Sequence, residues 1–276
     1  MHAFDTPGKT RLRVKNASGL ISVDPSENGR TTVELDALRD DDATHDAIAR
    51  ATVEMNGNEI TVEIGVGGKG FGVGPAWITF GRTPQVGIRI RCPEDTDLDC
   101  ATASADVAAS GRLGNVELKT ASGDIAVEHV SGLRVQSASG DVRAATVAGE
   151  ARLQTVSGDV RLGTVTGPVS ATLVSGEFAI DDAHTDLNAK TVSGDQRIDA
   201  VRQGEIRLQS VSGDVRVGIR RGTRLHIDAS STSGDVSSEL DVKDEPSATP
   251  SGSEARLHAK TVSGDIEITR AAAVSA

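Results

Sequence analysis

The chain has 276 residues, of which 30 are glycine, while four Phe, one Trp and no Tyr supply its aromatic rings. Because large cores are normally filled partly by such rings, we expect a thin core of Val, Ile, Leu, Ala and Thr. The 29 basic and 40 acidic residues give a net charge of −11, which argues against a nucleic-acid partner, since that binding depends on neutralising phosphates.

Residues 1–100 are predicted to form a β-rich N-terminal capping segment without a regular repeat. The segment begins without the cationic and apolar stretches of a secretory leader, and no run of about 18 apolar residues follows anywhere, so we expect a cytoplasmic protein without a membrane span rather than a surface protein. Asn56-Gly57 favours a hairpin, and residues 42–50 favour a short helix with an acidic first turn. Alternation of apolar residues predicts strands over 9–14, 20–23, 31–35, 51–55, 59–64 and 86–91.

A glycine-rich stretch follows the strand over 59–64. Residues 65–70 match the Gly-x-Gly-x-x-Gly string of dinucleotide sites, but the next residues are too rich in Gly and Pro to open the helix that such a site needs. We therefore predict a strand connection and no cofactor. Three of the five aromatic rings, Phe71, Trp77 and Phe80, lie here, and exposed rings can mark a contact loop, although they more often cover the end of a core.

From residue 101 onward one motif recurs. Ser-Gly-Asp, once Ser-Gly-Glu, is found at intervals of 17 to 19 residues from Gly123 to Gly213, and Ser104-Ala105-Asp106 is a degenerate first copy. The intervals then lengthen to 21 and 30 residues before Gly234 and Gly264. The longer interval contains a Pro-, Ser- and acid-rich stretch, which predicts a loop insertion at 243–254. We expect residues 255–269 to form the last coil and residues 271–276 to be a frayed tail.

Between these corners the sequence alternates with a period of two. Ile206 and Leu208 fall on one face before a corner, and Val215 and Val217 fall on one face after it. Two short strands and two tight turns, repeated at constant length, predict an all-β fold, a parallel β-solenoid (β-helix) with about 18 residues per coil over residues 101–270. An antiparallel sandwich is the alternative, but it would not require a constant period. We expect one column of valines inside the thin core, formed by Val156, Val174, Val192, Val211 and Val262.

The corner motif has a structural and a metal-binding interpretation. Glycine adopts a positive φ without steric cost, and Ser and Asp side chains accept hydrogen bonds from nearby N–H groups. Calcium prefers several oxygen ligands, and one carboxylate per coil offers too few. We therefore predict no metal site and a structural turn column, whose members include Ser122, Gly123, Asp124, Ser139, Gly140, Asp141, Ser157, Gly158, Asp159, Ser193, Gly194, Asp195, Ser212, Gly213 and Asp214. Arginines two residues after several corners should offset the like charges of the aspartates; these are Arg143, Arg161, Arg197 and Arg216.

No catalytic constellation is evident. The six histidines are scattered without metal-binding spacing, and neither a Gly-x-Ser-x-Gly elbow nor a Gly-Lys-Ser/Thr phosphate loop is present. Cys92 and Cys100 cannot form a disulfide framework. We therefore predict no catalytic residues.

The repeated Thr-Val-Ser-Gly-Asp units, at 155–160, 191–195 and 261–266, follow a strand that ends in Cys92-Pro93. Together they resemble the bacterial β-strand-repeat proteins named putative adhesins, a domain of unknown function, over nearly the whole chain. The resemblance implies a β-solenoid fold and an adhesin function, and it implies no catalytic residue.

Three functions remain open. The regular polar faces favour a non-enzymatic scaffold or protein-interaction module with an unidentified protein partner. The resemblance favours an adhesin or a carbohydrate-binding surface module. A solenoid polysaccharide lyase or hydrolase, with carboxylates in a groove, is the third interpretation. The sequence predicts no oligomeric state.

Overall fold

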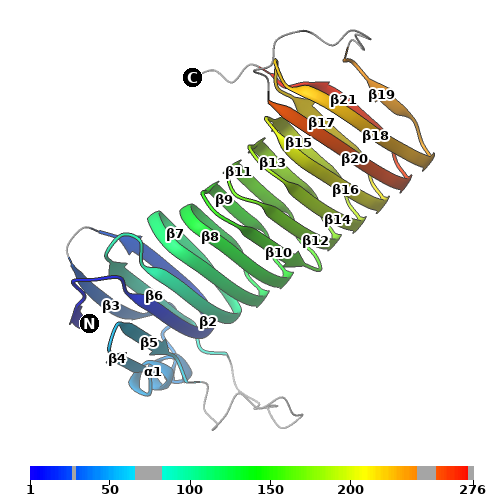
Figure 1. Ribbon diagram of the computed structural model, residues 1–276. Coiled ribbons are helices and arrows are strands. Elements are labelled where there is room, and N and C mark those ends of the chain that lie inside the picture. Colours follow the sequence, from blue (N-terminus) through cyan, green and yellow to red (C-terminus); the bar gives the residue numbers. More distant parts are fainter. Residues whose placement is uncertain (27–28, 66–82, 241–252, 273–276) are drawn as a thin grey trace. The chain divides into compact units, whose positions relative to one another are not determined.

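The computed structural model describes residues 1–26, 29–65, 83–240 and 253–272 (Figure 1). The fold is nearly all β, with 71% strand and 3% helix, and it confirms the predicted parallel β-solenoid. Contacts divide the chain into two compact units, Met1–Glu128 and His129–Ala276. No helix in the described ranges has the length and apolar character needed to cross a membrane.

The first unit is built around one long strand, β2, which pairs in parallel with β7 from Arg11↔Asp97 to Val23↔Ala109. The other edge of β2 is covered by β5 and β6, so both edges of this coil are paired. Strands β1, β3 and β4 add antiparallel partners to that cover. The elements are β1 (His2–Asp5), β2 (Arg11–Pro25), β3 (Arg30–Ala37), α1 (Asp42–Ala49), β4 (Thr52–Asn56), β5 (Glu59–Glu63), β6 (Val86–Cys92) and β7 (Asp97–Ser122).

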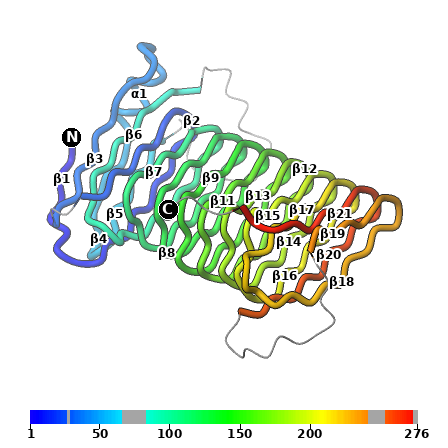
Figure 2. Tube along the Cα trace, turned by 90° about the horizontal axis from the view of Figure 1, so that it is seen from above, coloured from blue at the N-terminus to red at the C-terminus, as the bar shows by residue number. Residues whose placement is uncertain are grey.

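The second unit is a solenoid with two walls, visible along its length in Figure 2. Equivalent residues of neighbouring coils pair in parallel at an offset of 18, as in Ala151↔Val169 and Val160↔Phe178. The first wall, in spatial order, consists of residues 133–137 of β8 (Ile125–Ser139), followed by β10 (Ala151–Thr155), β12 (Val169–Ser175), β14 (Leu187–Ser193), β16 (Gly204–Ser212), β20 (Glu254–Ser263) and β18 (Arg224–Ser233). The second wall consists of β9 (Val142–Val147), β11 (Val160–Val165), β13 (Phe178–Ala183), β15 (Gln196–Val201), β17 (Val215–Ile219), β21 (Ile266–Arg270) and β19 (Val236–Ser238).

The core between the walls is thin and aliphatic, as the scarcity of rings predicts. Residues such as Leu153, Leu162 and Leu208 point inward and are fully buried, while their sequence neighbours point to solvent. Each coil buries these side chains only by stacking on its neighbours. Stability therefore depends on contacts between coils rather than within them.

The valines that precede the corners lie outside this core, so the prediction that places them inside is wrong. They are 45–54% exposed. Along β10 the inward positions belong to Ala151, Leu153 and Thr155, which leaves Val156 on the outer face. The inward threonine is tolerated because its hydroxyl donates to the carbonyl oxygen of Ser157 at 3.3 Å. A hydroxyl bonded to the turn, rather than a valine, therefore closes the core at the corner.

The coils are not stacked in sequence order at the C-terminal end. Strand β20 pairs with β16 through Ser212↔Ser263 and with β18 through Ser233↔Ser263. On the other wall, β21 pairs with both β17 and β19. The coil of residues 254–270 thus lies between the coils of 204–219 and 224–238, as Figure 1 shows. The prediction that residues 255–269 form the last coil is therefore wrong in space: β18 and β19 form the terminal coil.

Candidate functional site

The predicted turn column occupies one edge of the coils. Glycines at these corners have positive φ, for example 117° at Gly158 and 141° at Gly213. A Cβ atom on Gly158 would also collide with the carbonyl oxygen of Gly140 in the next coil. The corner therefore needs glycine both for its backbone conformation and for the close approach of neighbouring coils.

The aspartates of these corners bond between coils rather than within their own turn. The carboxylates of Asp141, Asp159, Asp195, Asp214 and Asp265 accept a hydrogen bond from the backbone N–H of the equivalent residue in a neighbouring coil. In the second unit the N–H···Oδ1 contacts are Asp159 to Asp141 (3.1 Å), Glu177 to Asp159 (2.9 Å), Asp214 to Asp195 (2.8 Å), Asp265 to Asp214 (2.9 Å) and Asp235 to Asp265 (2.8 Å). We call this set the aspartate ladder. The amide of Asp124 makes the same contact with Asp106 in the first unit, at 2.9 Å.

The arginines that follow the corners have mixed partners. Arg143 pairs with the corner aspartate Asp141 at 2.9 Å. The other three instead bind carboxylates elsewhere on the second wall: Arg161 binds Asp181 at 3.1 Å, Arg197 binds Asp199 at 2.7 Å, and Arg216 binds Glu267 at 3.0 Å. The expectation that these arginines offset the aspartate column therefore holds for one of the four. Hydrogen bonding to Arg197 lowers the pKa of Asp199.

The outer face of the first wall carries three parallel columns of exposed side chains. The valine column consists of Val156, Val174, Val192, Val211 and Val262. Beside it runs a column of amides, hydroxyls and amines, formed by Gln136, Gln154, Thr172, Lys190, Gln209 and Lys260. The side chains of Lys190 and Lys260 are exposed to solvent. The wall therefore presents an apolar line next to polar groups that are available to a ligand.

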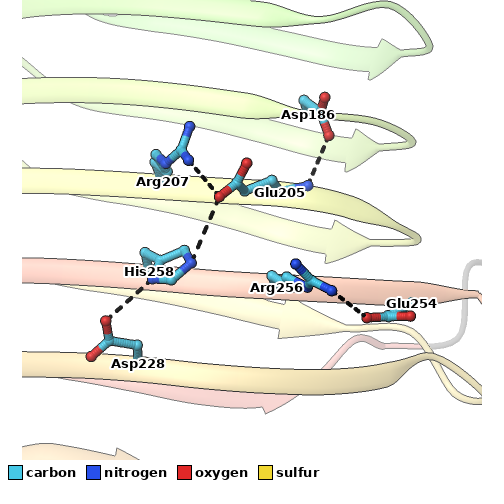
Figure 3. Close-up of polar contacts among 7 residues, drawn as sticks. All are labelled: Asp186, Glu205, Arg207, Asp228, Glu254, Arg256 and His258. Atoms are coloured by element: carbon cyan, nitrogen blue, oxygen red, sulfur yellow. Dashed lines mark hydrogen bonds and ion pairs between the residues drawn. The ribbon is translucent and has the colours of Figure 1, made fainter.

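The third column consists of Arg134, Arg152, Ser170, Asn188, Arg207, His258 and Asp228. It ends in a charged cluster on the last three coils of this wall (Figure 3). The His258 ring lies between two carboxylates: its Nε2 is 3.7 Å from Glu205 Oε1 and its Nδ1 is 3.2 Å from Asp228 Oδ2. Glu205 also binds Arg207 at 2.6 Å, and its backbone N–H donates to Asp186 Oδ1 at 2.8 Å. These contacts join β16, β20 and β18, and every member already has a protein partner.

A second charged cluster lies on the second wall around Asp182. Its Oδ2 atom is 2.8 Å from His184 Nε2 and 2.6 Å from an Arg220 nitrogen, and Arg202 lies 3.6 Å away. Burial acts to raise the pKa of Asp182, but the hydrogen bonds from His184 and Arg220 outweigh it, so that the pKa is lowered. Arg220, which directly follows β17 two coils away, makes a bidentate contact with Asp182 and so clamps the coils of β13, β15 and β17 together.

The remaining candidates are residues outside the described ranges and two buried thiols. Phe71, Trp77 and Phe80 lie outside the described residues, as do residues 66–70 of the glycine-rich string and 243–252 of the loop insertion. Cys92 and Cys100 are buried thiols whose pKa is raised to about 12, chiefly by burial. Within the described ranges no group of three or more His, Cys, Asp or Glu side chains is placed to hold a metal ion.

The family model of the Toastrack DUF4097 domain matches residues 9–269. The chain belongs to the Toastrack family. The family is a domain of unknown function, which agrees with the resemblance seen in the repeats. No curated protein matches the chain.

Two solved structures are similar to this Toastrack chain. One is described as a "putative lipid binding protein" from Parabacteroides distasonis; it is 15% identical, with a TM-score of 0.51, and the match covers 98% of this chain and 96% of the other. The second, a "putative adhesin" from the same organism, is 9% identical with a TM-score of 0.44, and the match covers 96% of each chain. The first of these shows that the fold is shared.

Three features were not predicted from the sequence: the exposed valine column, the terminal coil and the coil that β2 forms in the first unit. The phase of the alternation carried the first signal, because Thr155 continues the inward series of Ala151 and Leu153. The first coil also has a signal: Ser18-Gly19 has the serine and glycine of a corner, and it pairs with Ser104-Ala105.

Proposed function

We propose that this Toastrack protein is a non-enzymatic interaction scaffold that binds a protein partner on the outer face of its first wall. The observation that carries the proposal is the valine column, with one half-exposed valine on each of five coils. Single exposed apolar residues are ordinary on protein surfaces, but an aligned series on a flat wall forms a continuous apolar line.

The energetic reason is the apolar area that remains to be buried. Complete burial of a valine contributes about 1.5–3 kcal/mol, so covering the exposed half of each side chain contributes about 1 kcal/mol. Five aligned valines thus favour a partner that runs along the solenoid axis and contacts several coils at once. The adjacent Gln154, Lys190 and Gln209 offer hydrogen bonds that fix the position of such a partner.

The wall also supports a binding function because its groups are held rigidly. Each column is set by the parallel register of neighbouring strands, as in Ser175↔Ser193 and Ser193↔Ser212 next to the valines. A surface that is ordered before binding loses less conformational entropy when a partner arrives.

The test uses the tagged protein as bait in extracts of the cells that produce it. In the variant Val174→Thr, Val192→Thr and Val211→Thr, the side chains keep their branched shape but lose apolar surface. We expect this variant to melt like the wild type and to lose the captured partner. The matched control is Val174→Ile, Val192→Ile and Val211→Ile, which preserves the apolar line and should retain the partner. Soluble and envelope fractions are tested separately, so that the source of the partner is also identified.

The proposal fails if the threonine variant captures the same proteins as the wild type, or if neither enriches any protein over resin without bait. Capture by the threonine variant, together with loss after substitutions on the second wall, would move the binding face to that wall.

A further inference from the structure

The terminal coil has an open edge. In the described ranges β18 pairs with β20 alone and β19 pairs with β21 alone. Figures 1 and 2 show both strands at the C-terminal end of the second unit. In the first unit, by contrast, the coil formed by β2 has strand partners on both edges. An uncovered edge strand is a site for pairing with another chain.

The core is open at the same place. Ile227 is 44% exposed and Val236 is 47% exposed, whereas their register partners Leu257 and Ile266 are 1% and 0% exposed. The terminal coil thus presents inward apolar side chains that no described coil covers. A surface of this kind fits another strand with the same alternation.

The sequence of β18 is complementary to itself. Arg224, His226 and Asp228 point outward, and Leu225 and Ile227 are the inward residues between them. If two copies of β18 pair antiparallel about His226, Arg224 of each copy lies opposite Asp228 of the other. The same register places Leu225 opposite Ile227. Opposite charges and apolar residues then match twice, because the two-fold axis repeats each pair.

The backbone N–H and C=O groups of β18 also point in the directions that this register requires. The N–H of Arg224 donates to Ser253, so its polar groups face β20. Because these groups alternate along a strand, those of Leu225 and Ile227 face the open edge. In the register centred on His226, Leu225 and Ile227 form the hydrogen-bonded pairs, and the two His226 residues form the close, non-hydrogen-bonded pair between them.

We propose that the terminal coil is a homodimerisation surface at which β18 pairs antiparallel with β18 of a second copy, in the register centred on His226. This surface is separate from the valine column, so the proposal does not rest on the proposed function. The dimer is isologous and closed, since the same edge serves both partners.

The first test is a charge swap followed by sedimentation of the full chain over a range of concentrations. The wild type should dimerise, to twice 28.5 kDa. Arg224→Asp or Asp228→Arg alone places like charges opposite each other and should weaken dimerisation by roughly tenfold or more. The double variant restores opposite charges and should recover most of the affinity. Within its own chain the double variant disturbs both sites, including the Asp228 contact with His258, so a purely structural role predicts that it is the weakest of the three.

The second test reports the register. Under mild oxidation His226→Cys should form a disulfide-linked dimer, because residue 226 faces its own copy across the axis. Ser170→Cys, at an outward position of β12 in the column that contains Asp228, is the control and should remain monomeric.

A wild type that is monomeric at every concentration would overturn the proposal, as would equal cross-linking of the two cysteine variants. Hydrogen exchange identifies the cause: protected amides at Leu225 and Ile227 in such a monomer would mean that another part of the chain covers the edge. If the threonine variant of the valine column loses dimerisation while the Arg224 and Asp228 variants keep the wild-type dimer affinity, the dimer forms through the valine column and the β18 interface is refuted.

Discussion

The aspartate ladder has one step at which the sequence departs from its pattern, Glu177. The N–H of Glu177 donates to Asp159 Oδ1 at 2.9 Å, as elsewhere in the ladder. Among the described residues, however, no hydrogen bond joins the longer Glu177 side chain to the amide of Asp195, whereas Asp195 itself accepts from Asp214 at 2.8 Å. Replacing Glu177 with Asp should therefore add the missing bond.

The size of the effect follows from two opposing contributions. A hydrogen bond to a charged group contributes about 1.5–3 kcal/mol, and solvent exposure of the corner favours the lower end. The shorter side chain also brings two carboxylates closer, which costs less than about 1 kcal/mol at the coil spacing in water. We expect Glu177→Asp to raise the free energy of unfolding by about 1 kcal/mol, or the melting temperature by about 2–4 °C.

Denaturant unfolding followed by circular dichroism measures the change. Asp159→Glu should lower the free energy of unfolding by a comparable amount, because the longer side chain does not place its carboxylate against the amide of Glu177 in the same geometry. Glu177→Gln is the control, since it removes the charge without adding a bond. If Glu177→Asp unfolds at the wild-type denaturant concentration while Asp159→Glu shows no loss, the ladder does not fasten the coils.

Three further predictions follow from the corners, the charged cluster and the thiols. Gly158→Val should lower the free energy of unfolding by about 3 kcal/mol or more, because the φ of 117° at this position is disfavoured for a branched residue. Gly8→Val is the control and should melt like the wild type, since no atom lies within 4 Å of a new Cβ there. Equal melting temperatures of the two variants would contradict the corner geometry. Because the pKa of Asp182 is lowered in the folded protein, its ionised carboxylate stabilises the fold at pH values above the ordinary pKa of 3.8, and this contribution is lost as the pH falls through the lowered pKa. The difference in unfolding free energy between the wild type and Arg220→Gln should therefore shrink in acid. A difference that stays constant across an acid titration would count against the clamp. Because burial raises the pKa of Cys92 and Cys100 to about 12, neither should react with a thiol reagent at about pH 8 until the protein is unfolded, and rapid labelling of the native protein would show that the thiols are accessible.

The solenoid was predictable because its evidence is redundant. The 18-residue spacing, the glycine corners and the period-two alternation all require parallel stacking of equivalent residues. The predicted helix is also confirmed as α1, and Asp41 caps it by accepting the N–H of Thr44 at 2.8 Å. The acidic first turn, at Asp42, is the local signal from which this helix was predicted.

The outward valines and the order of the last coils were harder to predict for different physical reasons. Valine is normally assigned to a core, but here the phase set by Ala151 and Leu153 overrides its hydrophobicity at Val156. The order of the coils depends on which corner stacks on which. Because Ser212, Ser233 and Ser263 belong to nearly identical motifs, spacing alone cannot distinguish their neighbours.

The intercalated coil has a consequence for synthesis of the chain. Residues 224–238 leave the ribosome before residues 254–270, yet the later segment occupies the place next to β16 and β17. If β18 paired with β16 during translation, it would have to be displaced when residues 254–270 emerge, because β20 holds that position in the fold. The end of the solenoid therefore cannot be completed until residues 254–270 have emerged, and a chain that terminates before residue 254 lacks the coil that separates β16 from β18.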